Sequence, residues 1–244
     1  MLAAPVVLLC EYPTAHELEP CGGWQLSDAQ AQQRLQQLAR PAVRTQFALS
    51  RLLLERAAQQ LLTGASDWAL VVQRGGQPLL RSNAEQINLS ISHTAGLVAV
   101  ALAPAGQAIG VDVEAWSRPL RLQQLLAGCM SKDDADWCLG QASPEQAFLR
   151  HWTLKEAYLK ALGRGIAADL PALSFGLQAN GIALRASPYS DSRCWQFAHP
   201  PLLDDHCLAL AWATTAPKGG EWREAVAQAP LPVAGCKVRQ LRFA

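Results

Sequence analysis

The stretch from Phe148 to Gly165 reads FLRHWTLKEAYLKALGRG and predicts a long helix. Its apolar residues recur at spacings of three and four, which places them on one stripe of an amphipathic helix. Ser143 is a favourable N-cap before this stretch, and Gly163 and Gly165 mark its end. We therefore expect a helix that packs its apolar stripe into the core.

The polar edge of this helix suggests chemistry. Trp152, Glu156 and Lys160 follow one another at intervals of four, so a carboxylate and an ammonium share one face beside a large aromatic ring. An exposed Glu–Lys pair, worth only a few tenths of a kcal/mol, would show the same spacing. The spacing alone does not distinguish a functional helix face from an exposed ion pair, so the other motifs of the chain have to be considered.

Length and composition indicate an ordinary folded protein. The chain has 244 residues, enough for one large domain or two small ones, and half of them are hydrophobic. Only 17% of the residues are charged and the net charge is +1, which argues against disorder and against nucleic-acid binding.

The cysteines and the apolar first ten residues indicate the cellular compartment of the protein. The seven cysteines are scattered, without a C-x-x-C pair or a zinc-like spacing, which fits a reducing cytoplasmic environment. The opening MLAAPVVLLC lacks a positive first segment and a small-residue cleavage site, and no apolar run is long enough to span a membrane. We expect a cytoplasmic chain without a membrane segment.

The remaining pattern predicts alternating strands and helices. Strands are expected over 6–10, 68–73, 87–91, 97–102, 109–114, 174–177, 182–186, 195–198 and 207–213, and helices over 27–37, over 41–62 and as short pieces within 120–139. Residues 217–232 read as a peripheral tail with a short helical piece around 222–227.

A polar cluster ends the strand that begins at Ile87. Ser92, His93 and Thr94 offer two hydroxyls, an imidazole and backbone N–H groups before a glycine, which suits an anionic oxygen. A histidine at a turn can equally serve as a local hydrogen-bonding residue.

Two acids lie on one predicted strand, IGVDVE over 109–114. Because side chains alternate along a strand, Asp112 and Glu114 project from the same face. Burying both without a counter-charge costs several kcal/mol per ion, and a hard cation would remove that cost. With Glu156 as a third acid and no nearby His or Cys, the set favours Mg²⁺. The alternative is an edge strand with its polar face in water.

Together these segments resemble a known family. The order LSISHT, IGVDVE and WTLKEAYLKALGRGI is similar to the 4′-phosphopantetheinyl transferases of the Sfp type, and the match runs from about residue 76 to 166. The resemblance implies an α+β fold of two similar α/β halves, 1–106 and 107–244, related by a pseudo-twofold with the ligand cleft between them. It also implies Mg²⁺-dependent transfer of the phosphopantetheine arm of coenzyme A to a serine of an apo acyl or peptidyl carrier protein, with release of 3′,5′-ADP, by a monomer.

The resemblance also assigns residues to roles. Asp112, Glu114 and Glu156 match the magnesium-site acids, and Glu156 and Lys160 are the expected catalytic residues. The expected coenzyme A contacts are Arg51, Arg74, Gln77, Pro78, Ser92, His93, Asp112 and Lys160. Gln77 departs from the pattern, because the family has lysine in this G-K-P element, and Arg51 or Arg74 is expected to replace its charge.

Carrier recognition is expected at a basic and apolar surface formed by Arg118, Arg121, Leu122 and Leu125, although these residues also fit an ordinary helix surface. Two other functions stay open: a metal-dependent nucleotide phosphohydrolase, which shares the carboxylates, and a non-catalytic coenzyme A binding protein, suggested only by Gln77. The pathway of the carrier protein, whether fatty-acid, polyketide or peptide synthesis, is not specified by these residues.

Overall fold

The structure is a computed structural model that describes residues 2, 4–14, 18, 23–62, 67–73, 77–83, 85–165, 169–178, 181–214, 222–225, 233 and 235–243. Arg74, which was predicted to contact coenzyme A, lies outside these residues. Within the described part of the chain, no helix is both long and apolar enough to cross a membrane.

The chain alternates strands and helices, and the expected α+β class is confirmed. In order, the elements are β1 (Val6–Glu11), α1 (Ala29–Gln36), α2 (Pro41–Leu61), β2 (Ala69–Val72), β3 (Pro78–Arg81), β4 (Gln86–Thr94), β5 (Leu97–Pro104), β6 (Ala108–Ala115), α3 (Leu122–Cys129), α4 (Lys132–Leu139), α5 (Pro144–Ala161), a 3₁₀ turn (Leu170–Ala172), β7 (Ser174–Gln178), β8 (Gly181–Ala186), β9 (Cys194–Ala198), β10 (His206–Thr214), β11 (Trp222–Ala225) and β12 (Lys237–Phe243).

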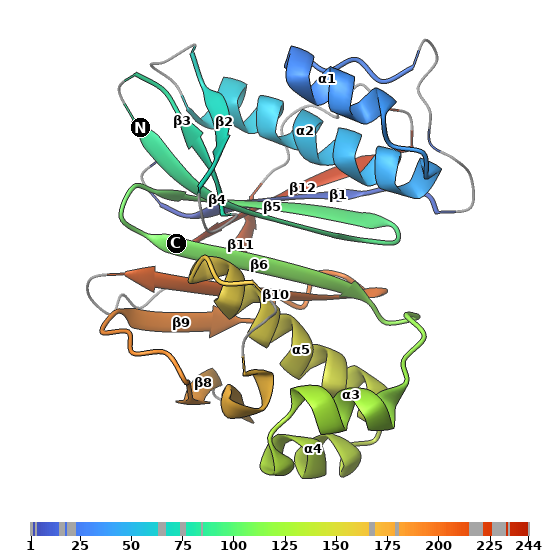
Figure 1. Cartoon of the computed structure of the whole chain (residues 1–244), viewed down its shortest axis with the longest axis vertical. Helices are drawn as coiled ribbons and strands as arrows, with labels where there is room; N and C mark the ends of the chain where they lie inside the picture. The colour runs from blue at the N-terminus through green and yellow to red at the C-terminus, as the bar shows by residue number, and fades with distance from the viewer. Residues whose placement is uncertain are drawn as a thin grey trace.

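Two sheets stack between helices, as Figure 1 shows. The larger sheet has the order β11-β12-β1-β5-β4-β3-β2, and the smaller has the order β6-β10-β9. One apolar core lies between the sheets and includes Leu9 and Val113, whereas α2 covers the outer face of the larger sheet and α5 the outer face of the smaller one. The result is four layers, helix–sheet–sheet–helix.

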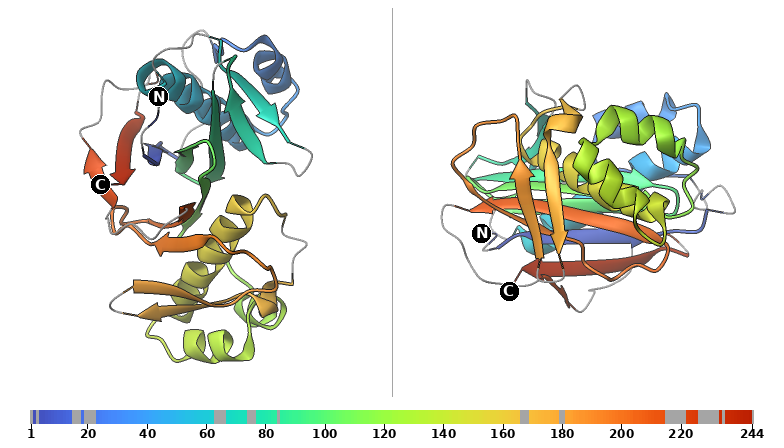
Figure 2. Two further views of the ribbon diagram at one scale, coloured as in Figure 1. Left: turned by 90° about the vertical axis from the view of Figure 1, so that its left-hand side faces the viewer. Right: turned by 90° about the horizontal axis from the view of Figure 1, so that it is seen from below.

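The two halves repeat one order of elements. A strand, helices, a hairpin and two more strands run from β1 to β5, and the same order runs from β6 to β10 (Figure 2). The first strand of each half pairs antiparallel with its last strand, β1 with β5 and β6 with β10. The expectation of two similar halves is therefore confirmed, whereas their boundary at residue 106 stays a prediction.

The C-terminal segment differs from the expectation. The helical piece predicted around 222–227 is wrong, because Trp222–Ala225 is strand β11 and pairs with β12. The strand β12 was not predicted. It pairs with β1, although the two strands lie near opposite ends of the sequence. Trp222 packs edge-on against Trp212, 5.4 Å between ring centroids. Partners this distant in sequence override the local helical pattern.

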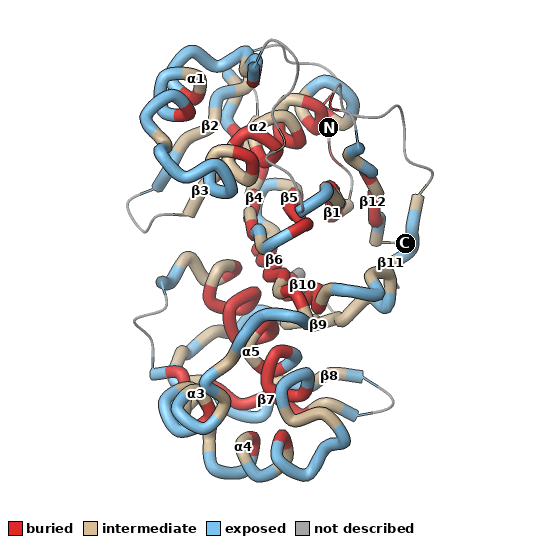
Figure 3. Tube along the Cα trace, turned by 90° about the vertical axis from the view of Figure 1, so that its right-hand side faces the viewer, coloured by how far each residue is buried: buried red, intermediate tan, exposed pale blue. Residues whose placement is uncertain are grey.

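Helix α5 is confirmed, but it is buried on more than one face. Buried positions run through the middle of the molecule from α2 through the sheets to α5 (Figure 3). Even Lys155 is fully buried, and its ammonium donates to Cys129 O at 2.7 Å and Leu170 O at 2.9 Å. Asp134 is its buried counter-charge at 3.8 Å. This helix is thus enclosed by the smaller sheet on one side and by α3 and α4 on the other.

Candidate active site

A close backbone contact places α5 on strand β6. A Cβ added at Gly110 would lie 1.8 Å from the carbonyl oxygen of Ala157, so only glycine fits there. Because α5 lies directly on β6, its residues Glu156 and Lys160 lie beside the acidic face of the strand. The polar helix face and the acidic strand face, each predicted separately from the sequence, therefore lie next to each other.

Asp112 has the most hydrogen bonds of the acids at this contact between α5 and β6. Its Oδ1 accepts a hydrogen bond from Lys160 Nζ at 2.7 Å and another from Ser92 Oγ at 2.8 Å. The same ammonium also donates to Val111 O at 3.2 Å. Asp112 Oδ2 is buried and has no hydrogen-bond partner among the described residues. One oxygen of this carboxylate is therefore fixed and the other is unsatisfied.

Glu156 carries a second unsatisfied oxygen. Its side chain is buried, and Oε1 has no hydrogen-bond partner within the described chain. Burial raises the pKa of Glu156 to about 7, and the negative charge of Asp112 adds to this rise while Lys160 opposes it. Glu156 lies one turn before Lys160 on α5, and Lys160 contacts Asp112 on β6, so the two elements bring these charges close together.

Glu114 makes a different set of contacts. Its Oε1 accepts a hydrogen bond from the Arg118 guanidinium. Burial raises the pKa of Glu114, and Arg118 opposes that rise. Among the described residues, no three His, Cys, Asp or Glu side chains are arranged as a complete metal-holding group. The third predicted acid is thus paired with an arginine.

The residues present fit a hard divalent cation. Asp112 Oδ2 and Glu156 Oε1 are buried carboxylate oxygens without partners, an arrangement that is costly unless a cation or water satisfies them. Oxygen ligands alone favour Mg²⁺ over zinc. Asp112 and Glu156 would hold it, and Glu114 would join them once Arg118 releases its carboxylate.

Three of the predicted coenzyme A contacts gather here, and a fourth lies next to them. Ser92 is buried and donates to Asp112, which Lys160 also contacts. His93 follows Ser92 at the exposed end of β4. The pKa of His93 is lowered by desolvation and by the positive charge of Lys160. Ser92, Asp112 and Lys160 thus form one cluster where the two halves meet, and His93 lies next to it on β4 with its side chain on the opposite face of the strand.

Gln77 reaches this cluster from the N-terminal half. It lies just before β3, next to Pro78, and its Nε2 donates to Lys160 O at 3.5 Å. Its amide oxygen also lies 2.9 Å from where a Cβ at Gly163 would be. Gln77 therefore contacts the end of α5, and Pro78 starts the neighbouring strand.

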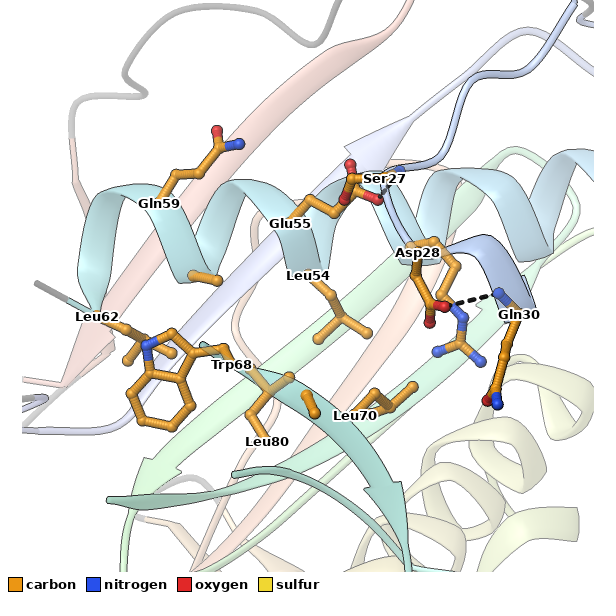
Figure 4. Close-up of a pocket in the computed structure, with 13 residues that line it drawn as sticks. Ser27, Asp28, Gln30, Leu54, Glu55, Gln59, Leu62, Trp68, Leu70 and Leu80 are labelled. Carbon is orange, nitrogen blue, oxygen red and sulfur yellow. Dashed lines mark hydrogen bonds between the residues drawn. The ribbon is translucent and has the colours of Figure 1, made fainter. Parts of the chain in front are cut away.

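Arg51 lies in a separate cavity. This cavity, about 930 Å³ in volume, lies between α2 and the β2–β3 hairpin and is lined by Leu54, Trp68 and Leu70 as well as Arg51 (Figure 4). The guanidinium lies 4.7 Å from the ring centroid of Phe47. Desolvation lowers the pKa of Arg51. The structure does not bring this arginine into the Asp112 cluster.

Two residues of the site were not predicted from sequence as parts of it. Gly110 stands inside a strand pattern, where a glycine signals close approach of another backbone, and this signal was present. Arg118 was expected only as part of a docking surface, and no sequence signal pairs it with Glu114.

Comparisons with known proteins find a match for the segment that contains this site. Residues 108–211 match the sequence model of the 4′-phosphopantetheinyl transferase superfamily. This segment holds both the acidic strand and α5. The resemblance to this superfamily, noted from the motifs, is confirmed.

The individual relatives described next share less than 30% sequence identity with this chain. The chain is 29% identical to a phosphopantetheinyl transferase of Thraustochytrium sp. over 56% of this chain and 52% of that protein. It is 27% identical to 4′-phosphopantetheinyl transferase Sfp of Bacillus subtilis over 57% of this chain and 60% of that protein. These matches thus span between half and two thirds of the relatives' own lengths. Among solved structures, the holo-[acyl-carrier-protein] synthase of Thermotoga maritima aligns over 50% of this chain and 70% of that chain, with a TM-score of 0.36 and 17% identity.

Proposed function

We propose that this protein transfers the 4′-phosphopantetheine arm of coenzyme A to a serine of an apo acyl or peptidyl carrier protein and releases 3′,5′-ADP. The observation that carries the proposal is the convergence of Asp112, Glu156 and Lys160, from β6 and α5, within the segment that matches the superfamily. Relatives named as phosphopantetheinyl transferases support the same reaction.

Coenzyme A would lie with its pyrophosphate over this cluster. Lys160 supplies an ammonium there, and His93 supplies a ring N–H at the exposed end of β4. Both would stabilise the negative charge that collects on the phosphates and on the leaving 3′,5′-ADP. Mg²⁺, held by Asp112 and Glu156 with Glu114, would neutralise the diphosphate. Gln77 contributes an amide where the family has a lysine, so less positive charge faces the nucleotide.

Glu156 is the proposed general base. The attacking carrier serine must lose its proton as its oxygen bonds to the β-phosphorus of coenzyme A and the bond to the 3′,5′-ADP oxygen breaks. Glu156 lies one turn before Lys160 on α5, and its Oε1, which has no hydrogen-bond partner in the described part of the chain, is available for that proton. Lys160 is the poorer candidate, because its ammonium already donates to Asp112 Oδ1 and Val111 O.

The carrier protein is proposed to dock next to Glu114. Arg118, which is 39% exposed, and the exposed Arg121 lie where β6 leads into α3, with Leu122 and Leu125 half-buried beside them. Carrier proteins are generally acidic, so a basic and apolar surface at the edge of the site is complementary to them. Docking there would draw Arg118 toward the partner and free Glu114.

Mass spectrometry of an apo carrier protein tests the proposal. After incubation with this protein, coenzyme A and Mg²⁺, the carrier should gain one phosphopantetheine arm on its serine, and a carrier with that serine changed to alanine should gain none. Incubation with coenzyme A and Mg²⁺ alone separates the alternatives. Release of 3′,5′-ADP without any carrier would support a nucleotide phosphohydrolase, and no reaction in either case would support a coenzyme A binding protein.

We also propose a cytoplasmic monomer. The six cysteines in the described part of the chain are all free, which suits a reducing compartment. The repeat of one order of elements within a single chain supports a complete site in one copy.

A further inference from the structure

Three hydroxyl groups connect the two halves of the molecule. They belong to Ser90, Ser92 and Thr94, which point from the same face of β4, and each accepts a hydrogen bond from a backbone N–H of β6. The donors are Val111 at 3.1 Å, Val113 at 3.3 Å and Ala115 at 3.4 Å, always 21 residues further along the chain. We call this set the hydroxyl ladder.

The ladder replaces a missing strand partner. One edge of β6 pairs with β10, and the ladder satisfies N–H groups of its other edge. The strand is therefore held between β4 on one side and α5 on another, where Gly110 allows direct backbone contact. The acidic residues of β6 thus occupy a position that both halves define.

Ser92 differs from the other two members of the ladder. It uses its oxygen to accept from Val113 N–H and its hydrogen to donate to Asp112 Oδ1 at 2.8 Å. Because Lys160 also binds Oδ1, both donors hold the same oxygen, and Oδ2 is left without a hydrogen-bond partner among the described residues. The hydroxyl of Ser92 therefore helps to decide which oxygen of Asp112 is available.

We infer that Ser92 is a positioning residue: it orients Asp112 so that Oδ2 is presented to a divalent cation, and the hydroxyl ladder fixes this orientation relative to α5. The inference rests on the proposed function, because the cation is the one that function requires. Without the Ser92 hydroxyl, the carboxylate of Asp112 can rotate and offer both oxygens to Lys160. Groups that orient a metal ligand commonly change metal affinity by about 10- to 100-fold.

Ser90 provides a matched control. It is as deeply buried as Ser92 and accepts the equivalent backbone hydrogen bond, from Val111 instead of Val113. Its replacement by alanine removes one contact of the ladder and leaves the Ser92–Asp112 hydrogen bond in place. A comparison of Ser92→Ala with Ser90→Ala therefore separates the orientation of Asp112 from the general cost of a lost buried hydrogen bond.

Titration calorimetry with Mg²⁺ alone tests the inference. Ser92→Ala should weaken Mg²⁺ affinity at least about tenfold, whereas Ser90→Ala should change it less than about twofold, with similar shifts in the urea midpoints of the two variants. Equal affinities in the two variants would overturn the inference. If Ser92→Ala does not fold, the isosteric pair Ser92→Thr and Ser92→Val decides, since only threonine keeps the hydroxyl and Thr94 shows that threonine fits the ladder.

The same titration separates this inference from the proposed function. Wild-type protein that binds no Mg²⁺ would overturn the role of Ser92. Wild-type protein that binds Mg²⁺ through Ser92-dependent orientation but transfers no phosphopantetheine arm would overturn only the proposed reaction. In an active enzyme, Ser92→Ala should raise the Mg²⁺ concentration at half-maximal rate, whereas Ser90→Ala should change it less than about twofold.

Discussion

Lys160 Nζ on α5 lies 2.7 Å from Asp112 Oδ1 on β6, across 48 residues of sequence. The pair is only partly shielded, with 29% of the lysine side chain and 8% of the aspartate side chain exposed. One acid of the cluster is thus compensated by a charge of the protein itself. Glu114 is compensated by Arg118, whereas Glu156 Oε1 has no hydrogen-bond partner among the residues that the structure describes.

Glu156→Gln should abolish transfer and preserve the fold. Glutamine has the same shape but accepts no proton at neutral pH, and loss of a general base typically costs about 100- to 10,000-fold in rate. The mass-spectrometric assay of the carrier protein gives the rate, and a urea titration gives the stability. Glu145→Gln, an exposed change at the start of the same helix, should affect neither. Turnover of Glu156→Gln within a few fold of wild type would remove Glu156 from this role.

Arg118→Ala should tighten Mg²⁺ binding. The guanidinium holds Glu114 Oε1, so the cation competes with it for that carboxylate. Release of one such partly exposed pair is expected to improve affinity about two- to fivefold, because exposed pairs are worth at most about 1 kcal/mol. Calorimetric titration measures the change, with the exposed Arg121→Ala as control for net charge. Equal gains in the two variants would indicate a general charge effect instead of competition at Glu114.

Much of the site was predictable because it depends on local periodicity. The spacing of four between Glu156 and Lys160 and the alternation of Asp112 and Glu114 follow from the geometry of a helix and a strand. These side-chain spacings do not depend on where the helix or strand lies in the fold. The structure brings Asp112, Glu156 and Lys160 together as the two patterns suggest.

The remainder depends on contacts between distant segments. The hydroxyl ladder needs β4 to cross beside β6, and nothing in the residues around Ser92 specifies that neighbour. Strand β12 pairs with β1 only because the chain returns to the first sheet, so a local pattern could not place it. Arg51 had a suitable charge for a nucleotide contact, but α2 directs it into another cavity.

Gly110→Ala should destabilise the protein strongly. The added Cβ would lie 1.8 Å from Ala157 O, so α5 has to move away from β6 and the acid cluster separates. The expected cost is at least about 3 kcal/mol, the upper end of overpacking penalties, with loss of Mg²⁺ binding. Gly128→Ala is the control, since beyond its chain neighbours and the adjacent backbone of helix α3 no described residue lies within 4 Å of its added Cβ. There alanine should be neutral or stabilising by about 0.5–1 kcal/mol. A Gly110→Ala protein as stable as wild type would contradict the close contact of α5 and β6.

His151 should make the protein sensitive to mild acid. It is buried in α5 against Trp137, and burial lowers its pKa to about 4, although Asp134 opposes the shift. Lys155 on the same helix, and His199 and Arg185 from neighbouring segments, add to the lowering. The unfolded chain binds a proton at His151 below about pH 6.5, whereas the folded protein does so only near pH 4, so stability falls as pH drops through this interval.

His151→Leu should reduce this loss. Leucine keeps an apolar side chain beside Trp137 and removes the titrating ring, so the fall in unfolding free energy between pH 7 and pH 5 should shrink by about 1 kcal/mol or more. Urea titrations at the two pH values measure it. His199, whose pKa burial also lowers to about 4, should account for part of what remains, and a His151→Leu/His199→Leu double variant should flatten the profile further. An unchanged pH profile in both variants would show that neither imidazole is buried in the neutral form.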